Sequence, residues 1–158
     1  MKKKMLLFWQ ESCAHAVLDV TITLRANFPF EVSAAGIKEP PAEAFDTARS
    51  RYDALYLLGE LECGSPALWL LSEDISYAGY EYLYGACLGN AAVVSSARTG
   101  YGENLHKEIC HEAGHLSGLE HCPNPCVMNT SPDKRRLFDK PMIFCADCSW
   151  RLNKEKLR

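Results

Sequence analysis

The chain has 158 residues, of which 47% are hydrophobic and 23% are charged. These proportions are those of a globular protein, and they exclude a disordered chain, a collagen-like repeat and a coiled coil. Seventeen Lys and Arg against 20 Asp and Glu leave a net charge of -3, which argues against a nucleic acid as the partner.

The N-terminal segment and the eight cysteines bear on the cellular compartment. Residues 2–4 are basic and residues 5–9 are apolar, but this apolar run is shorter than the roughly 7 to 15 residues of an export signal. No other stretch approaches the about 18 apolar residues of a membrane span. We therefore expect a cytoplasmic protein without a membrane partner, in which cysteine thiols stay reduced and free to bind metal.

The first third of the chain alternates between strand and helix patterns. Residues 5–9 form an apolar run of strand length, and the apolar positions of residues 13–28 recur at steps of three and four, which predicts a helix ended by Pro29. Residues 45–55 repeat the helical spacing after Pro41, a residue suited to a first helical turn. The predicted order is strand, helix, short strand, helix.

Three extended segments are predicted in the middle of the chain. Residues 67–71 are apolar and predict a strand, and Tyr80, Tyr82 and Tyr84 alternate with other residues as in an extended segment. Residues 91–96 are a short β-rich run that we expect to lie antiparallel to a neighbour. The predicted fold class is α/β, or mixed α+β, with helices packed on a twisted mixed sheet.

Residues 103–118 return to a helical pattern that places two histidines on one face. His111 and His115 are four residues apart, about 40° around the helix axis, so one ion can contact both. Gly118 permits a sharp turn after the helix, and this turn can return His121 to the same ion as a third ligand. Three neutral imidazoles leave a zinc ion one open position for water.

Glu112 lies beside these histidines and is the candidate catalytic residue. A water molecule on zinc has a pKa of about 7, and Glu112 can accept its proton while the water attacks a carbonyl polarised by the metal. The predicted reaction is hydrolysis. Two alternatives stay open, namely a zinc-binding scaffold or peptide-binding protein without turnover, and a nucleic-acid-binding zinc module. Glu112 argues against the first alternative, because a structural site needs no base.

Four cysteines form a second candidate metal site. Three residues separate Cys122 from Cys126, and two separate Cys145 from Cys148. Four thiolates fill a tetrahedral zinc site and leave no place for water, so this site is expected to be structural. A redox dithiol, two disulfides or an iron–sulfur cluster are the alternatives for these thiols. Because His121 directly precedes Cys122, we expect the two metal sites to be coupled.

The histidine segment, with the sequence HEAGHLSGLEH, resembles the zinc-binding motif of the metzincin metallopeptidases. Met128, two residues after Cys126, matches the methionine that these enzymes place below the metal in their Met-turn. The four cysteines match the second zinc site of the archaemetzincin branch, and residues 45–53 and 91–98 look like segments of the same family. The chain is therefore similar to archaemetzincins over most of its length.

The resemblance implies a zinc-dependent peptidase, and aminopeptidase action is the narrower activity that it implies. It also implies two zinc ions per chain, one catalytic and one structural. The implied partner is a peptide or protein substrate, held in extended form by an edge strand at residues 91–96. Met128 is expected to form a hydrophobic base beneath the metal.

The implied architecture is one compact metzincin-like domain over residues 1–158. Residues 1–118 would contain the sheet, its helices and the active-site helix. Residues 119–158 would contain the third histidine, the Met-turn, the cysteine site and a last helix. The gaps after Cys122 and after Met128 are each one residue shorter than in the family pattern, so we expect the cysteine site to form with altered backbone detail.

Overall fold

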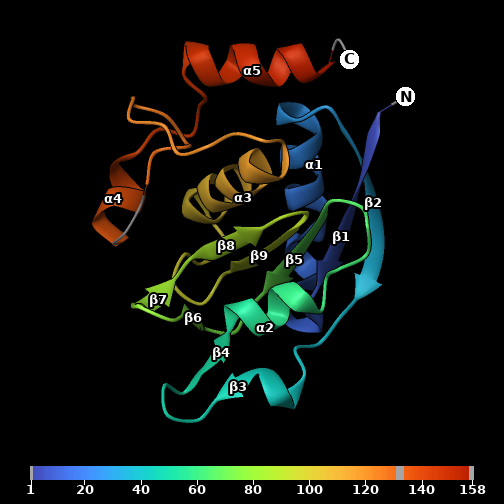
Figure 1. Ribbon diagram of the computed structural model, residues 1–158, viewed down its shortest axis with the longest axis vertical. Coiled ribbons are helices and arrows are strands. Elements are labelled where there is room, and N and C mark those ends of the chain that lie inside the picture. Colours follow the sequence, from blue (N-terminus) through green and yellow to red (C-terminus); the bar gives the residue numbers. More distant parts are fainter. Residues whose placement is uncertain (1, 131–133, 157–158) are drawn as a thin grey trace.

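A five-stranded mixed sheet lies at the centre of the computed structural model (Figure 1). The structure describes residues 2–130 and 134–156, and at 81–82, 134–136 and 155–156 it describes the backbone alone. In spatial order its strands are β2 (Phe30–Ile37), β1 (Lys3–Trp9), β5 (Ala67–Leu71), β9 (Ala91–Ser95) and β8 (Gly85–Leu88). The first four are parallel to one another, and β8 runs antiparallel to β9 at one edge. The predicted α/β class with a mixed sheet is confirmed.

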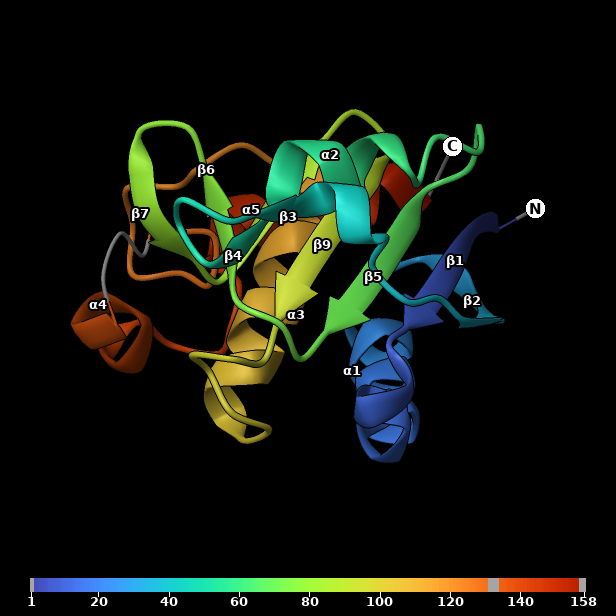
Figure 2. The ribbon, with the colours of Figure 1, turned by 90° about the horizontal axis from the view of Figure 1, so that it is seen from below.

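Helices cover both faces of this sheet. Figure 2 shows α1 (Val17–Asn27) and α3 (Glu103–Leu116) on one side of it and α2 (Ala54–Gly59) on the other. Successive residues of a strand point to opposite faces, so Leu70 packs in the core beneath α1 and α3, whereas Trp69 packs in the core beneath α2. Because both faces are covered, β5 and β9 are buried at every position, which explains their continuous apolar sequences.

A second, four-stranded sheet flanks the first. Its strands, in spatial order, are β3 (Phe45–Asp46), β4 (Arg51–Asp53), β6 (Ile75–Tyr77) and β7 (Tyr80–Leu83). The predicted extended segment around the three tyrosines is thus confirmed for β7. The β6–β7 hairpin leads directly into the edge strand β8.

The predicted helix over residues 45–55 is wrong. Phe45 and Tyr52 pair across the β3–β4 hairpin, with ring centroids 5.2 Å apart. Asp46 Oδ1 accepts hydrogen bonds from two backbone N–H groups of the following turn, which favours a turn over a helix. Helix α2 begins only after Asp53, whose carboxylate caps its first turn. A separation of seven residues fits both a helix face and a short hairpin, so the spacing alone could not distinguish them.

The edge position predicted for residues 91–96 is also wrong, although their strand conformation and antiparallel neighbour are confirmed. Strand β9 lies between β5, to which it is parallel, and β8, to which it is antiparallel. The edge strand is β8. Its sequence, Gly-Ala-Cys-Leu, contains no β-branched residue and therefore carries almost no strand signal.

The remaining helical predictions are confirmed with shifted boundaries. A 3-10 segment (Glu11–Ala16) precedes α1, which ends two residues before Pro29. After α3 the chain forms loops around two further helices, α4 (Lys134–Asp139) and α5 (Ala146–Lys156). Among the described residues, no helix combines the length and the apolar character needed to cross a bilayer.

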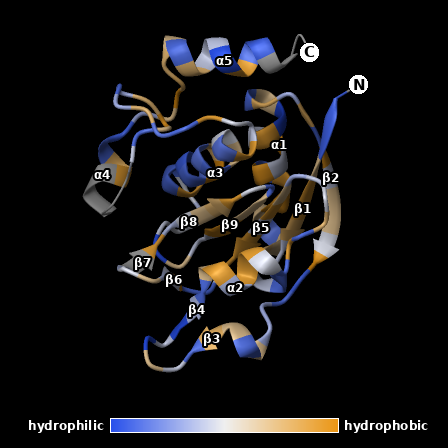
Figure 3. Ribbon diagram, in the orientation of Figure 1, coloured by the Kyte–Doolittle hydropathy of each residue, from blue (hydrophilic) through white to orange (hydrophobic). Residues whose placement is uncertain are grey.

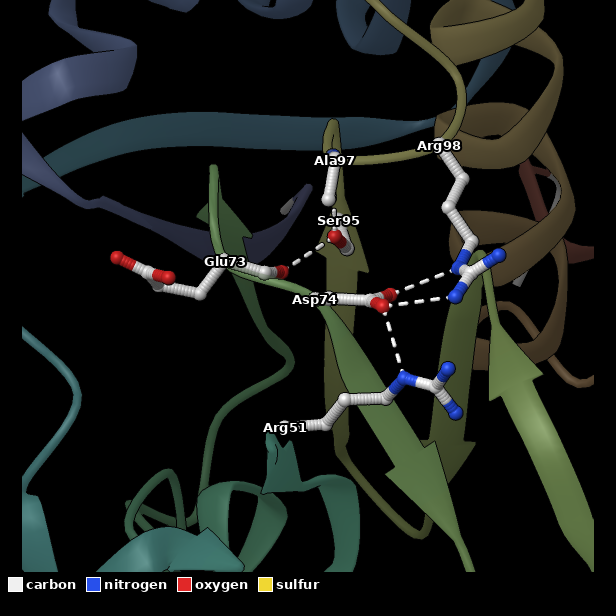
Figure 4. Close-up of polar contacts among 6 residues, drawn as sticks. All are labelled: Arg51, Glu73, Asp74, Ser95, Ala97 and Arg98. Carbon is white, nitrogen blue, oxygen red and sulfur yellow. Dashed lines mark hydrogen bonds and ion pairs between the residues drawn. The ribbon is translucent and has the colours of Figure 1, made fainter. Parts of the chain in front are cut away.

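Asp74 connects the small sheet to the main one (Figure 4). Its carboxylate accepts one hydrogen bond from Arg51 Nε of β4 at 2.9 Å and two from the guanidinium of Arg98, each at 2.8 Å. Asp74 lies between β5 and β6, and Arg98 lies in the loop between β9 and α3. The three residues therefore hold the start of α3 and the β6–β7 hairpin in one arrangement.

Replacing Asp74 by Ala is expected to lower the free energy of unfolding by about 2 kcal/mol, because two partly buried guanidinium groups lose their carboxylate. Chemical denaturation of the variant measures this change. Glu60→Ala is the control, since the Lys38–Glu60 pair is 4.0 Å long and more exposed. It should change the stability by less than about 1 kcal/mol. Equal effects of the two substitutions would contradict the role given to Asp74.

Candidate active site and metal centres

Helix α3 is buried although many of its residues are polar. It is mostly blue in Figure 3, beside the orange strands of the main sheet. Lys107, Glu108, His111 and Glu112 are only 4 to 6% exposed. Burying charged groups costs free energy unless they are paired, so such a helix is typical of a functional site rather than of a structural core.

The structure brings the three predicted histidines together at the C-terminal end of α3. The ring centroids of His111 and His115 are 4.8 Å apart, and the ring of His121 lies 5.3 Å from the first and 4.9 Å from the second. One nitrogen from each ring lies within 4.8 Å of the others. Gly118 makes this possible, because its φ of 85° is strained for other residues and turns the chain back after the helix.

Backbone carbonyls orient two of these rings. His111 Nδ1 donates to the Val127 carbonyl at 3.0 Å, and His115 Nδ1 donates to the Leu119 carbonyl at 2.8 Å. With the protons on Nδ1, the two Nε2 atoms, 3.2 Å apart, keep their lone pairs for a metal. Burial lowers the pKa of His111 to about 3 and also lowers that of His115, so both rings are neutral, as metal ligands must be. The donor set fits zinc.

Glu112 offers a free carboxylate oxygen at this site. Its Oε2 is buried and has no hydrogen-bond partner among the described residues. Burial raises the pKa of Glu112 above its usual value, and the neighbouring Glu108, one helical turn earlier, raises it further. A buried oxygen without a partner is rare in proteins, and here it is suited to bind a water molecule beside the histidines.

A cavity of about 530 Å³ opens onto these residues. It lies between α3, the edge strand β8, the β6–β7 hairpin and α2. Its charged and imidazole lining residues are Glu108, His111, Glu112, His115, His121 and Lys140. The volume lies within the usual range of small-ligand sites.

Gly85 of β8 brings the edge strand against the turn of α3 that carries Glu108 and Glu112. A Cβ atom at this position would lie 2.9 Å from Glu108 Oε1, from Glu112 Cγ and from the Val93 carbonyl oxygen. Any other residue would therefore push the strand and the helix apart. The sequence does not indicate this contact, because nothing local shows that a glycine in a four-residue strand faces a glutamate more than 20 residues later.

The four predicted cysteines also come together. Their sulfur atoms lie within 4.8 Å of one another, and all four are free thiols. Cys126 Sγ accepts hydrogen bonds from the backbone N–H groups of Met128, at 3.4 Å, and Cys145, at 3.3 Å. A backbone hydrogen bond from Cys148 lowers the pKa of Cys145 to about 6, which favours the thiolate. The arrangement fits a tetrahedral zinc site.

One short segment touches both groups of ligands. Cys126 belongs to the thiol cluster, Val127 accepts the hydrogen bond of His111, and Met128 is fully buried. Met128 packs so closely on Gly114 that a Cβ atom there would overlap its sulfur. The predicted Met-turn residue thus lies directly against the turn of α3 that carries His115.

The chain is similar to known proteins over most of its length. The model of peptidase family M54 matches residues 51–154. The archaemetzincin of Halobacterium salinarum is 30% identical over 156 residues, which cover 85% of this chain and 90% of that protein. The archaemetzincin of Nanoarchaeum equitans is 32% identical and covers 90% of this chain and 84% of its own length.

Two crystal structures have the same fold. The archaemetzincin of Archaeoglobus fulgidus superimposes with a TM-score of 0.84 at 27% identity and covers 94% of this chain and 99% of its own. That of Methanopyrus kandleri gives 0.83 at 28% identity and covers 99% and 96%. With the histidine and cysteine clusters on the same fold, the chain belongs to the archaemetzincins, the zinc metallopeptidases of peptidase family M54.

Proposed function

We propose that the chain hydrolyses peptide bonds at the cavity beside α3, with Glu112 as the general base. The observation that carries the proposal is the buried, unpartnered Oε2 of Glu112 next to three convergent imidazoles. His111, His115 and His121 would hold a catalytic zinc ion, which polarises the substrate carbonyl and lowers the pKa of water. Glu112 accepts a proton from the attacking water and delivers it to the leaving amine.

We further propose a second, structural zinc ion at Cys122, Cys126, Cys145 and Cys148, which brings the count to two per chain. Four thiolates leave no position for water, so this site has no catalytic role of its own. It would fix the segment from which Val127 orients His111 and Met128 supports α3. A cytoplasmic location suits this proposal, because a reducing compartment keeps the thiols available for zinc.

The edge strand β8 is the proposed site of substrate binding, in place of residues 91–96. The hydrogen bond from Ser95 N to Tyr84 O sets the alternation of the β8–β9 pairs, so the backbone groups of Ala86 and Leu88 face β9. Those of Gly85 and Cys87 face the other way, toward the cavity. An extended peptide can add to this edge as a further strand, close to the turn of α3 that carries Glu112.

Aminopeptidase action is the narrower activity that we propose, because the cavity has the size of a site for a short ligand rather than for a long chain. N-acetylated and free forms of the same peptide distinguish this activity from internal cleavage. A scaffold role without turnover is the alternative. The buried carboxylate of Glu112 argues against it, since a scaffold gains nothing from an unpaired buried oxygen.

Replacing Glu112 by Gln should lower kcat by about 10²-fold or more while both zinc ions remain bound, because the amide has nearly the same shape but cannot accept the proton. Hydrolysis of a mixed peptide library and zinc content by mass spectrometry measure the two effects. Glu120→Gln, an exposed glutamate next to His121, is the control and should keep full activity. Undiminished cleavage by Glu112→Gln would exclude Glu112 as the base.

Replacing Gly85 by Ala should lower kcat/KM by about tenfold to a hundredfold, because the added methyl group displaces Glu112 or the edge strand. Gly59→Ala is the matched control, since a Cβ atom at Gly59 meets nothing within 4 Å. Steady-state kinetics on one peptide compare the two variants. Wild-type kinetics in Gly85→Ala would show that the close approach has no part in catalysis.

Replacing Cys145 by Ser should weaken zinc binding at the three histidines by about tenfold or more, although Cys145 contacts none of them. The reason is that the loop carrying His121 and Val127 loses its anchor. Competition with a chelator measures the affinity of the histidine site, and cobalt absorption distinguishes imidazole from thiolate coordination. Cys63→Ser, an exposed thiol outside both clusters, is the control. An unchanged affinity in Cys145→Ser would show that the sites are independent.

A further inference from the structure

The cavity contains a buried lysine that the proposed mechanism does not use. Lys140 directly follows α4, and it is the one lysine among the described residues of the cavity lining. Its residue is 7% exposed, and its Nζ lies 3.3 Å from His111 Nδ1. A buried ammonium group is costly unless acceptors surround it.

Lys140 has fewer acceptors than donors. A lysine ammonium carries three N–H groups, and one of them donates to the Asn129 carbonyl at 3.2 Å. His111 Nδ1 is no acceptor, because it donates its own proton to Val127. Among the side chains that the structure describes, no carboxylate lies within 4.0 Å of Nζ. Counted over the described residues, at least one N–H group of Lys140 thus has no acceptor and is available to a ligand in the cavity.

The charge of the cavity favours an anionic group at this position. Glu108 and Glu112 attract the ammonium of Lys140, but neither forms an ion pair with it. When zinc occupies the histidine site, the metal and Lys140 carry three positive charges, and the hydrogen-bonded pair Glu108 and Glu112 carries at most two negative ones, so at least one positive charge is in excess. A carboxylate on the substrate would balance this charge.

We propose that Lys140 is a specificity-determining residue, which binds a carboxylate carried by the peptide substrate next to the scissile bond. The proposal rests on the peptidase function proposed above. Lys140 contacts His111, a ligand of the proposed catalytic metal, so it lies close to the place where the scissile bond would be held. One residue of an extended peptide spans only about 3.5 Å. The carboxylate therefore belongs to a residue that adjoins the scissile bond. It is either the C-terminal carboxylate or the side chain of Asp or Glu.

Four matched peptides test the proposal. The first pair ends one residue beyond the scissile bond, and one member has a free C-terminal carboxylate whereas the other is amidated. The second pair differs only next to the scissile bond, where one member has Asp and the other has Asn. Calorimetry measures their binding to zinc-loaded Glu112→Gln, and steady-state kinetics measure their cleavage by the wild type. At least one carboxylate-bearing peptide should bind and be cleaved about tenfold or more better than its neutral partner. The pair that shows the preference identifies the source of the carboxylate.

Variants of Lys140 assign the preference to its charge. Lys140→Met should reduce the preference to about one, whereas Lys140→Arg should retain most of it. Lys107→Met is the matched control, because Lys107 is equally buried but donates to the Leu137 and Phe138 carbonyls and does not line the cavity. Circular dichroism and the cobalt spectrum of the histidine site verify that each variant is folded and binds metal.

The possible outcomes separate the two proposals. No preference for either carboxylate, or a preference that survives in Lys140→Met, overturns the role of Lys140. If the wild type cleaves no peptide but zinc-loaded Glu112→Gln still binds the carboxylate forms more tightly, the peptidase proposal fails and the recognition by Lys140 stands. A loss of the preference in Lys107→Met as well would mean that the effect is structural and would also overturn the proposal.

Discussion

The hydrogen bond from His111 Nδ1 to the Val127 carbonyl is the contact on which the rest of the site depends. It selects the tautomer whose Nε2 faces the other histidines, and it joins α3 to the segment that carries Cys126 and Met128. The thiol cluster holds this segment from the other side. The ring of His111 is therefore oriented by a backbone segment that the thiol cluster holds in place.

The position of β8 is the second constraint. Because Gly85 has no side chain, the edge strand lies directly against the turn of α3 that carries Glu108 and Glu112. The same strand leaves alternate backbone groups unpaired on the side of the cavity. Asp74, through Arg98, holds the loop that leads into α3, so the strand edge and the proposed base keep a defined distance.

The buried charged groups of the cavity lie on α3 and in the segment after α4. Glu112 is proposed to accept protons and Lys140 to bind a carboxylate, and each would lower the stability of an ordinary core. The surrounding strands compensate for this cost, because β5 and β9 are apolar and buried along their whole length. The groups proposed to act in catalysis and binding are thus gathered on α3 and in the segments beside it, and the sheet beneath α3 supplies stability.

The sequence by itself determined the family and the α/β class. It also determined the two clusters of candidate metal ligands, the three histidines and the four cysteines, because ligands close together in the chain follow helix and turn geometry. It did not determine the hairpin at residues 45–55 or the edge strand β8, since short segments carry weak periodicity. Only the tertiary structure decided that Gly85, Glu108 and Lys140 meet at the cavity. The physical reason is that these contacts join residues distant in sequence, and packing alone brings such residues together.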